Sequence, residues 1–156
     1  MAESFVGLGF DVHPRDDEGE LRLGGVAFPG EPALAAHSDG DVVCHAVADA
    51  LLGAAGLGDL GELLPDTDPS LAGIGGDDVL ARILGVLSGA GRTPSSLDVT
   101  VVCDRPAIAP RRQEIRERLA AIVGLPVERV SVKATRPEGL ALSGDGVACL
   151  ALAVVR

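Results

Sequence analysis

The pattern of hydrophobic and polar positions predicts strands and helices in alternation. Short apolar or alternating runs favour strands over three stretches, residues 5–13, 97–103 and 130–134. Apolar positions at helical spacing predict three helices, over residues 40–54, 77–90 and 111–123. A last apolar run, Gly146–Val155, predicts a long buried strand. This order favours an α+β fold in which a mixed four-stranded sheet is covered by helices on one face.

Between the first strand and the first helix the pattern is less regular. Arg15–Glu20 is predicted as a charged turn, Leu21–Phe28 as a Gly-broken strand or hairpin, and residues 31–36 as a loop. Ser38 is the candidate N-cap of the first helix, and Asp41 would support the positive end of its dipole.

The final strand predicts association between chains. Residues 146–155 are apolar on both faces of a strand. A sheet covered by helices on one side leaves the other apolar face open to water, and contact between subunits is the natural way to bury it.

Composition favours one domain over residues 1–156 with an aliphatic core. The chain is 47% hydrophobic but has only three Phe and neither Trp nor Tyr. Cys44, Cys103 and Cys149 are odd in number and widely spaced, as expected of buried thiols in a reducing compartment. No signal peptide or long apolar run is visible, so we expect a cytoplasmic protein with no membrane partner.

The net charge of −10 argues against a nucleic-acid-binding or anionic-membrane surface, because no basic stripe is present. A polyanionic small molecule could still bind. It would need metal ions, helix N-termini or local arginines to reverse the field at the site.

The strongest chemical signal is a predicted metal site formed by Asp11, His13 and His45. Asp11 and His13 are two residues apart, so they point to the same side of a strand. His45 falls in the first predicted helix. Two imidazoles and one carboxylate leave a fourth zinc position open, which is the catalytic pattern. A lone His is more often a core or surface residue, but this pattern accounts for two of only three histidines.

His37 and Ser38, just before the first helix, are candidates for phosphate contact. Unpaired N–H groups and the positive dipole end at a helix N-terminus suit phosphate oxygens. The simpler alternative is that Ser38 only caps the helix, and both readings can hold together.

These motifs resemble those of the 2-C-methyl-D-erythritol 2,4-cyclodiphosphate synthase family. The resemblance lies in Gly9–His13, Ala36–Ala46, Asp49–Asp59, Pro65–Pro69 and Lys133–Thr135, and it runs in order from about Val6 to the C-terminus. It implies a cytoplasmic homotrimer with active sites between subunits. It also implies a metal-dependent phosphorus–oxygen lyase of isoprenoid precursor synthesis, in which a CDP-methylerythritol 2-phosphate cyclises and releases CMP.

The resemblance assigns roles to further residues. His37 and Ser38 contact the substrate phosphate, and His37 helps to stabilise the transition state. Glu138 binds a second cation, Mg²⁺ or Mn²⁺, beside the zinc of Asp11, His13 and His45. The remaining substrate contacts, with the methylerythritol end named first, are Asp59, Gly61, Asp66, Asp68, Cys103, Ala107, Ala109, Thr135 and Leu142.

Four positions depart from the family pattern. Ala107 replaces a lysine, Arg136 a threonine assigned to transition-state stabilisation, Leu142 an aromatic residue, and Asp145 an arginine near the trimer axis. Arg136 could take over the lost catalytic and charge contacts. Three interpretations stay open: an ordinary synthase, a diverged paralogue acting on another nucleotide-diphosphate or diphosphate ester, and a non-catalytic metal-binding trimer.

Overall fold

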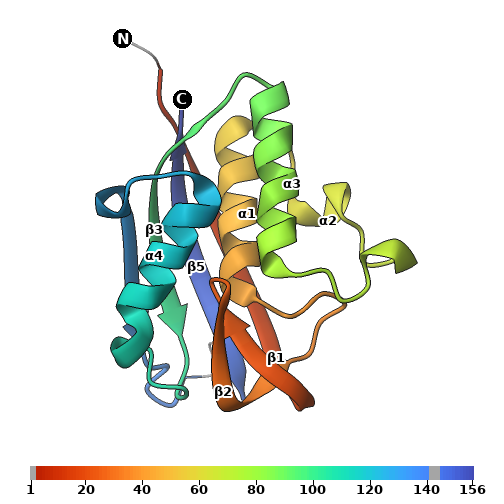
Figure 1. Cartoon of the computed structure of the whole chain (residues 1–156), viewed down its shortest axis with the longest axis vertical. Helices are drawn as coiled ribbons and strands as arrows, with labels where there is room; N and C mark the ends of the chain where they lie inside the picture. Colours follow the sequence, from red (N-terminus) through yellow and green to blue (C-terminus); the bar gives the residue numbers. More distant parts are fainter. Residues whose placement is uncertain (1–2, 141–144) are drawn as a thin grey trace.

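The computed structural model describes residues 3–140 and 145–156 (Figure 1). It has five strands, β1 (Phe5–Leu23), β2 (Val26–Leu34), β3 (Pro94–Val102), β4 (Val130–Thr135) and β5 (Gly146–Val155). Four α-helices are present in these residues, α1 (Val42–Ala55), α2 (Leu60–Leu63), α3 (Gly76–Gly89) and α4 (Arg112–Val123). Single 3₁₀ turns η1, η2 and η3 cover Pro69–Leu71, Ala109–Arg111 and Val127–Arg129.

The strands form one mixed sheet in the order β2-β1-β5-β3-β4. Strand β5 is antiparallel to both β1 and β3, whereas β3 and β4 are parallel. The mixed α+β fold is confirmed, but the prediction of four strands is wrong, because β2 adds a fifth at the edge beside β1.

The hairpin predicted over Leu21–Phe28 is present, but it is longer than predicted, because residues 15–20 and 31–34, predicted as a turn and a loop, extend its two strands. Strand β1 does not stop at His13 but continues through the charged residues 15–20 to Leu23. It then turns at Gly24 and Gly25, which both have positive φ, and β2 runs back to Leu34. Charged residues fit this long hairpin because the register shifts at Glu20 and many of its side chains face solvent.

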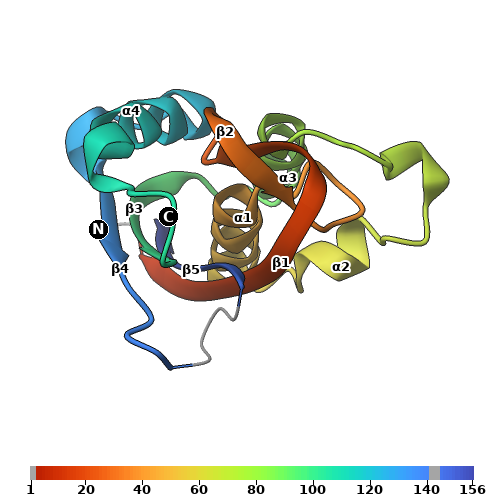
Figure 2. The ribbon, with the colours of Figure 1, turned by 90° about the horizontal axis from the view of Figure 1, so that it is seen from below.

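The sheet curls around α1, and α1, α3 and α4 lie on its concave side (Figure 2). Helix α1 packs against β1 at two glycines. A Cβ atom on Gly7 would overlap Ala50 O, and one on Gly9 would overlap Ala46 O. The two glycines therefore set how closely the helix approaches the strand that carries Asp11 and His13.

The other face of the sheet has no helix over it within the described residues, and it is apolar over β1 and β5. Side chains that alternate with Gly7 and Gly9 along β1 are exposed there, with fractions from 41% for Val12 to 67% for Leu8. Leu150 and Leu152 of β5 lie opposite Phe10 and Leu8 and are also exposed. This is the open apolar face that the pattern of the final strand predicts.

Asp41, not Ser38, caps α1. Its buried carboxylate accepts hydrogen bonds from the N–H groups of Val43 and Cys44 and from Gly24 and Gly25 across the hairpin turn. Burial raises the pKa of Asp41, and the N–H groups of Gly25, Cys44 and Gly24 act in the opposite direction. The sequence suggested that unpaired N–H groups at this helix N-terminus could bind a phosphate. In the structure the N–H groups of Val43 and Cys44 donate to Asp41 instead and are not free for a phosphate.

The core is aliphatic, as composition predicted, and the three cysteines are free and buried in it. Among the described residues there is no helix both long and apolar enough to cross a membrane.

Candidate functional site

Asp11, His13 and His45 come together in the middle of β1, near the end of its pairing with β5 and beside the start of α1. The Oδ2 atom of Asp11 lies 2.8 Å from His13 Nε2 and 3.1 Å from His45 Nδ1, and the two ring nitrogens are 3.3 Å apart. One ligand atom from each residue falls within 4.8 Å of the others, which suits a shared metal ion. The predicted triad is therefore assembled in the structure.

Electrostatics hold Asp11 in the form that suits a cation, and they favour a protonated His45, whose proton a metal ion would displace. Burial acts to raise the pKa of Asp11, but hydrogen bonds from His13 and His45 outweigh it, so the pKa falls well below its usual range. For His45, burial acts to lower the pKa, and the Asp11 carboxylate raises it above the ordinary histidine value. An ionised carboxylate beside two imidazoles, which a bound cation would keep neutral, matches the ligand chemistry of zinc.

Ser38 orients His45 from the side opposite Asp11. Its Oγ lies 3.0 Å from His45 Nε2 and accepts a hydrogen bond from Gly40 N at 3.1 Å. With Nδ1 directed to the metal position, Nε2 carries the proton that it donates to Ser38. Such outer contacts fix the tautomer and the ring orientation of a ligand histidine.

Two cavities adjoin the triad. One, of about 330 Å³, is lined by the ligands Asp11 and His45, and its remaining lining residues are Asp49, Leu60, Gly61, Leu64 and Asp66. The other, of about 120 Å³, is lined largely by apolar side chains and includes His37 and Ser38. Four residues predicted as substrate contacts, His37, Ser38, Gly61 and Asp66, therefore surround the metal position.

Asp59 and Asp68 do not line either cavity. Asp59 caps α2 by accepting a hydrogen bond from Glu62 N, and Asp68 accepts two from the N–H and hydroxyl of Ser70. The contacts from Ser70 lower the pKa of Asp68. In this chain the carboxylates of Asp59 and Asp68 therefore accept hydrogen bonds from residues of their own turns.

Asp49 is a further carboxylate that lines the cavity beside Asp11 and His45, and the sequence patterns predicted no role for it. It is half-buried, accepts a hydrogen bond from Leu60 N at 2.7 Å, and so holds the start of α2 against α1. Burial is the main cause that raises its pKa. Its place four residues after His45 on α1, one helical turn on, is the signal that could have found it.

The predicted nucleotide contacts line a third cavity, of about 210 Å³, at the carboxyl ends of β3 and β4. Cys103, Ala107, Ala109, Thr135 and Arg136 lie around it, and Arg112 adds a second guanidinium. Burial raises the pKa of the Cys103 thiol to about 11, so the thiol is uncharged near neutral pH and lines the cavity as a neutral side chain. None of the residues lining this cavity is a member of the metal triad.

Glu138 and Asp145 do not line these cavities. Glu138 is exposed and has a φ of 52°, which is unusual for a residue other than glycine. Asp145 is exposed and approaches Arg15 of β1. Leu142 lies outside the described residues.

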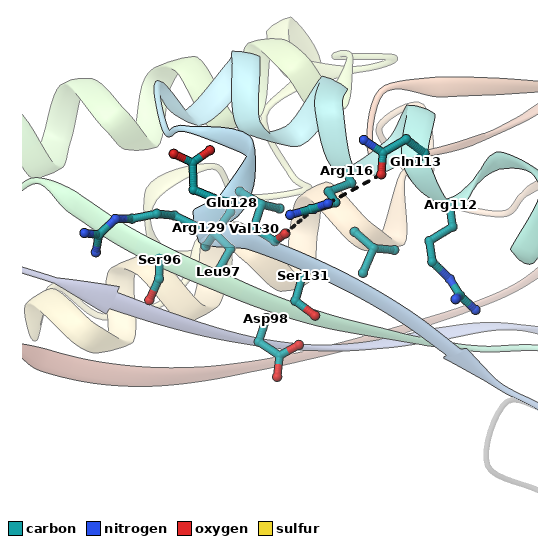
Figure 3. Close-up of a pocket in the computed structure, with 11 residues that line it drawn as sticks. Ser96, Leu97, Asp98, Arg112, Gln113, Arg116, Glu128, Arg129, Val130 and Ser131 are labelled. Atoms are coloured by element: carbon teal, nitrogen blue, oxygen red, sulfur yellow. Dashed lines mark hydrogen bonds between the residues drawn. The ribbon is translucent and has the colours of Figure 1, made fainter.

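A larger cavity, of about 760 Å³, lies between α4, η3 and the β3–β4 edge (Figure 3). It contains none of the predicted site residues. Arg116 donates a hydrogen bond from Nε to Val130 O at 2.6 Å, and Arg112 and Arg129 are directed to opposite ends of the cavity (Figure 3). Because these guanidinium groups diverge, they do not form an anion site.

Comparison with known proteins assigns the fold and the motifs to one family. The YgbB family model matches residues 4–156. The chain belongs to the YgbB family. It is 45% identical over 152 residues to the 2-C-methyl-D-erythritol 2,4-cyclodiphosphate synthase of Symbiobacterium thermophilum, covering 96% of this chain and 97% of the relative.

Solved structures agree with the sequence relatives. A 2C-methyl-D-erythritol-2,4-cyclodiphosphate synthase with CDP bound superposes with a TM-score of 0.88 at 34% identity and covers 97% of this chain and 99% of its own. The bifunctional IspDF of Campylobacter jejuni gives a TM-score of 0.92 at 37% identity, with 98% of this chain matching 42% of that one. This YgbB-family chain is accordingly an enzyme of the cyclodiphosphate synthase type, a lyase of isoprenoid precursor synthesis.

Proposed function

We propose that this enzyme converts CDP-methylerythritol 2-phosphate to the 2,4-cyclodiphosphate with release of CMP, in the cytoplasm and as a homotrimer. The observation that carries the proposal is the assembled triad of Asp11, His13 and His45 beside two cavities that hold further predicted contacts. In the reaction a 2-phosphate oxygen forms a bond to the β-phosphorus, and the bond between that phosphorus and the oxygen of the CMP phosphate breaks. CMP leaves with the bonding electron pair.

The residues fit a zinc ion. Asp11 Oδ2, His13 Nε2 and His45 Nδ1 would hold it, since one oxygen and two nitrogens with ligand atoms this close are a three-ligand catalytic set. Glu138 would hold Mg²⁺ or Mn²⁺. When bound, the two cations supply charge neutralisation for two phosphates that otherwise repel each other.

The chain's own residues bind and orient the substrate. His37 and Ser38 contact a phosphate through their side chains, because Asp41 caps the helix N–H groups. Gly61 and Asp66 face the sugar alcohol in the cavity beside the metal position. Thr135, Arg136 and the 103–109 turn surround the nucleotide. No protein nucleophile is needed, because the two reacting groups belong to one molecule and holding them together lowers the barrier.

The homotrimer proposal rests on the apolar face and on charge. All Lys and Arg residues except Arg15 and Arg22 lie in residues 82–156, with the nucleotide cavity, whereas the metal ligands lie in the acidic first half of the chain. A head-to-tail contact would place the basic half of one subunit against the acidic half of the next. It would also bury the exposed side chains of β1 and β5.

Arg136 is proposed as the catalytic replacement for the family's threonine and for the lysine absent at Ala107. It lines the nucleotide cavity opposite Ala107 and is exposed, so its guanidinium can reach a diphosphate. A guanidinium grips phosphate with two donors and a full charge.

The test is incubation of the metal-loaded protein with CDP-methylerythritol 2-phosphate, following release of CMP and formation of the cyclic product. We expect Arg136→Thr to lower the rate by on the order of 10- to 1,000-fold, the range for loss of a transition-state charge contact. Arg129→Thr, which changes an arginine outside the nucleotide cavity, is the matched control and should keep the rate.

A folded wild type that shows no CMP release contradicts the proposal. If Arg136→Thr combined with Ala107→Lys then gains activity on this substrate, the chain is a diverged paralogue with another substrate. If zinc binds and neither protein turns over, the non-catalytic interpretation stands.

A further inference from the structure

Arg15 is a nearly buried cation that the family motifs do not include. Its side chain is only 7% exposed, although arginine usually keeps its guanidinium in water. It lies on β1 two residues after His13, next to the segment of the strand that holds the metal ligands. A buried guanidinium is stable only if its donors find partners, so its contacts show what it holds in place.

The partners of Arg15 belong to three different segments. Its Nη2 donates a hydrogen bond to Arg105 O in the turn after β3, and its Nη1 donates to Pro32 O of β2 at 3.4 Å. The third segment is the residue that precedes β5, Asp145, whose Oδ1 is 3.8 Å from Arg15 Nε and whose backbone oxygen accepts from Arg15 N at 3.0 Å. Glu31 Oε2 lies 3.7 Å from Nη1 and adds a second negative charge.

The contact with Arg105 reaches the wall of the nucleotide cavity. Arg105 stands between Asp104 and Pro106, which both line that cavity together with Cys103 and Ala107. The Arg15 charge is also felt at Cys103, where it opposes the effect of burial on the thiol pKa. Arg15 itself does not line the cavity, so its guanidinium supports the turn without forming part of the cavity surface.

Arg15 donates hydrogen bonds to two main-chain carbonyls and has two carboxylates within ion-pair distance, so this contact is more than an exposed ion pair. A planar fork of donors fixes directions as well as distance, which a lysine ammonium does not. Asp145 contributes less, because its own side chain is 85% exposed and its charge is screened by water. The stronger restraint is on the turn, where main-chain position decides the shape of the cavity wall.

We propose that Arg15 is a positioning residue that holds the Cys103–Ile108 turn against the metal-bearing segment of β1 and thereby preorganises the nucleotide cavity. Arg15 does not touch the substrate. It fixes the main chain of the turn that lines the nucleotide cavity of its own subunit. This inference rests on the proposed function, because it takes a cytidine diphosphate as the ligand of that cavity.

The experiment compares Arg15→Met with Arg116→Met in zinc- and magnesium-loaded protein. Methionine keeps much of the side-chain volume and removes the donors. Arg116 is the matched control, because it is a half-buried arginine that also donates to a main-chain carbonyl, Val130 O, outside the nucleotide cavity. The measurements are the CDP dissociation constant by calorimetry, zinc content, thermal melting, KM and kcat, and amide hydrogen exchange of the turn in ligand-free protein.

We expect Arg15→Met to weaken CDP binding about tenfold, the order expected from loss of one charge-assisted hydrogen bond. KM should rise more than kcat falls, zinc content should be unchanged, and exchange at the Arg105 and Ala107 amides should become faster. Arg116→Met should leave CDP affinity within about twofold of the wild type, even if its melting temperature drops equally.

A folded Arg15→Met protein with wild-type CDP affinity and wild-type exchange in the turn overturns the proposal. So does an equal loss of CDP affinity in both variants, which would mark a general effect of stability. If Arg15→Met does not fold, Arg15→Lys replaces it in the experiment, because lysine keeps the positive charge but lacks the planar set of guanidinium donors. Wild-type CDP affinity in Arg15→Lys would then also overturn the proposal. A wild type that fails to bind CDP refutes the proposed function instead, and the exchange comparison still tests Arg15.

Discussion

At the scale of single residues, the metal triad depends on the two imidazoles sharing one carboxylate. Asp11 Oδ2 lies within hydrogen-bond distance of both rings, and these contacts keep the carboxylate ionised despite partial burial. Ser38 then fixes the ring of His45 through its other nitrogen. The ligand atoms are thus already aimed at a common point, which reduces the cost of binding an ion.

His45→Ala should abolish stoichiometric zinc binding, because two ligands from one strand cannot enclose the ion. We expect affinity to fall by about 100-fold or more, since loss of outer-shell partners alone costs 10- to 100-fold. His37→Ala is the control, because His37 lines the adjoining cavity but is not in the triad, and it should keep zinc while CMP release falls. Metal analysis after dialysis measures the difference. Full zinc content in both His45→Ala and His13→Ala would refute the site.

At the scale of elements, close packing of α1 on β1 places His45 over Asp11 and His13. The helix reaches the strand because Gly7 and Gly9 have no side chain at the contact. Asp41 links the start of the same helix to the β1–β2 turn through Gly24 and Gly25. Helix α1 is therefore fixed at its beginning and along its length. His45 lies in the first turn of α1, so its position is fixed as well.

Gly9→Ala should destabilise the protein and impair metal binding together. The new methyl group would overlap Ala46 O, so α1 must move away from β1. Overpacking of this kind costs about 1–3 kcal/mol or more. Gly53→Ala is the matched control on the same helix, because its nearest atom is Gly7 Cα at 4.0 Å and alanine favours the helix by about 0.5–1 kcal/mol. Denaturant unfolding with zinc titration checks this, and an unchanged Gly9→Ala protein would contradict it.

At the scale of the whole molecule, one face of the sheet is apolar and exposed. Leu8 and Phe10 of β1 are 67% and 51% exposed and lie beside Leu152 and Leu150 of β5. A continuous apolar patch over paired strands is typical of an interface between subunits. The separation of the triad from the nucleotide cavity also favours sites completed by a second copy.

Leu8→Glu should shift the proposed trimer toward monomer, because it would place a charge in the core of the proposed interface. Val86→Glu is the control, since Val86 is an exposed apolar residue of α3 on the other side of the molecule. Light scattering at micromolar concentration gives the mass of each protein. A wild type with the mass of a monomer or a dimer would exclude the trimer, and a trimeric Leu8→Glu would exclude this face as its interface.

Much of the site was readable from local sequence. The two-residue spacing of Asp11 and His13 fixes a common face in any strand, and helical periodicity places His45 near the start of α1. The apolar character of both faces of Gly146–Val155 likewise predicts the open face of the sheet, because burial depends on side-chain chemistry. The family motifs in the first half of the chain add the reaction type.

Tertiary structure alone decided the rest. Charged residues between Arg15 and Glu20 indicate a turn locally, yet pairing with β2 makes them part of β1, because strand pairing is set by partners distant in sequence. Asp41 became the cap in place of Ser38 since its carboxylate also reaches Gly24 and Gly25 across the hairpin. The role of Arg15 follows from Arg105, a contact across ninety positions that no local pattern encodes.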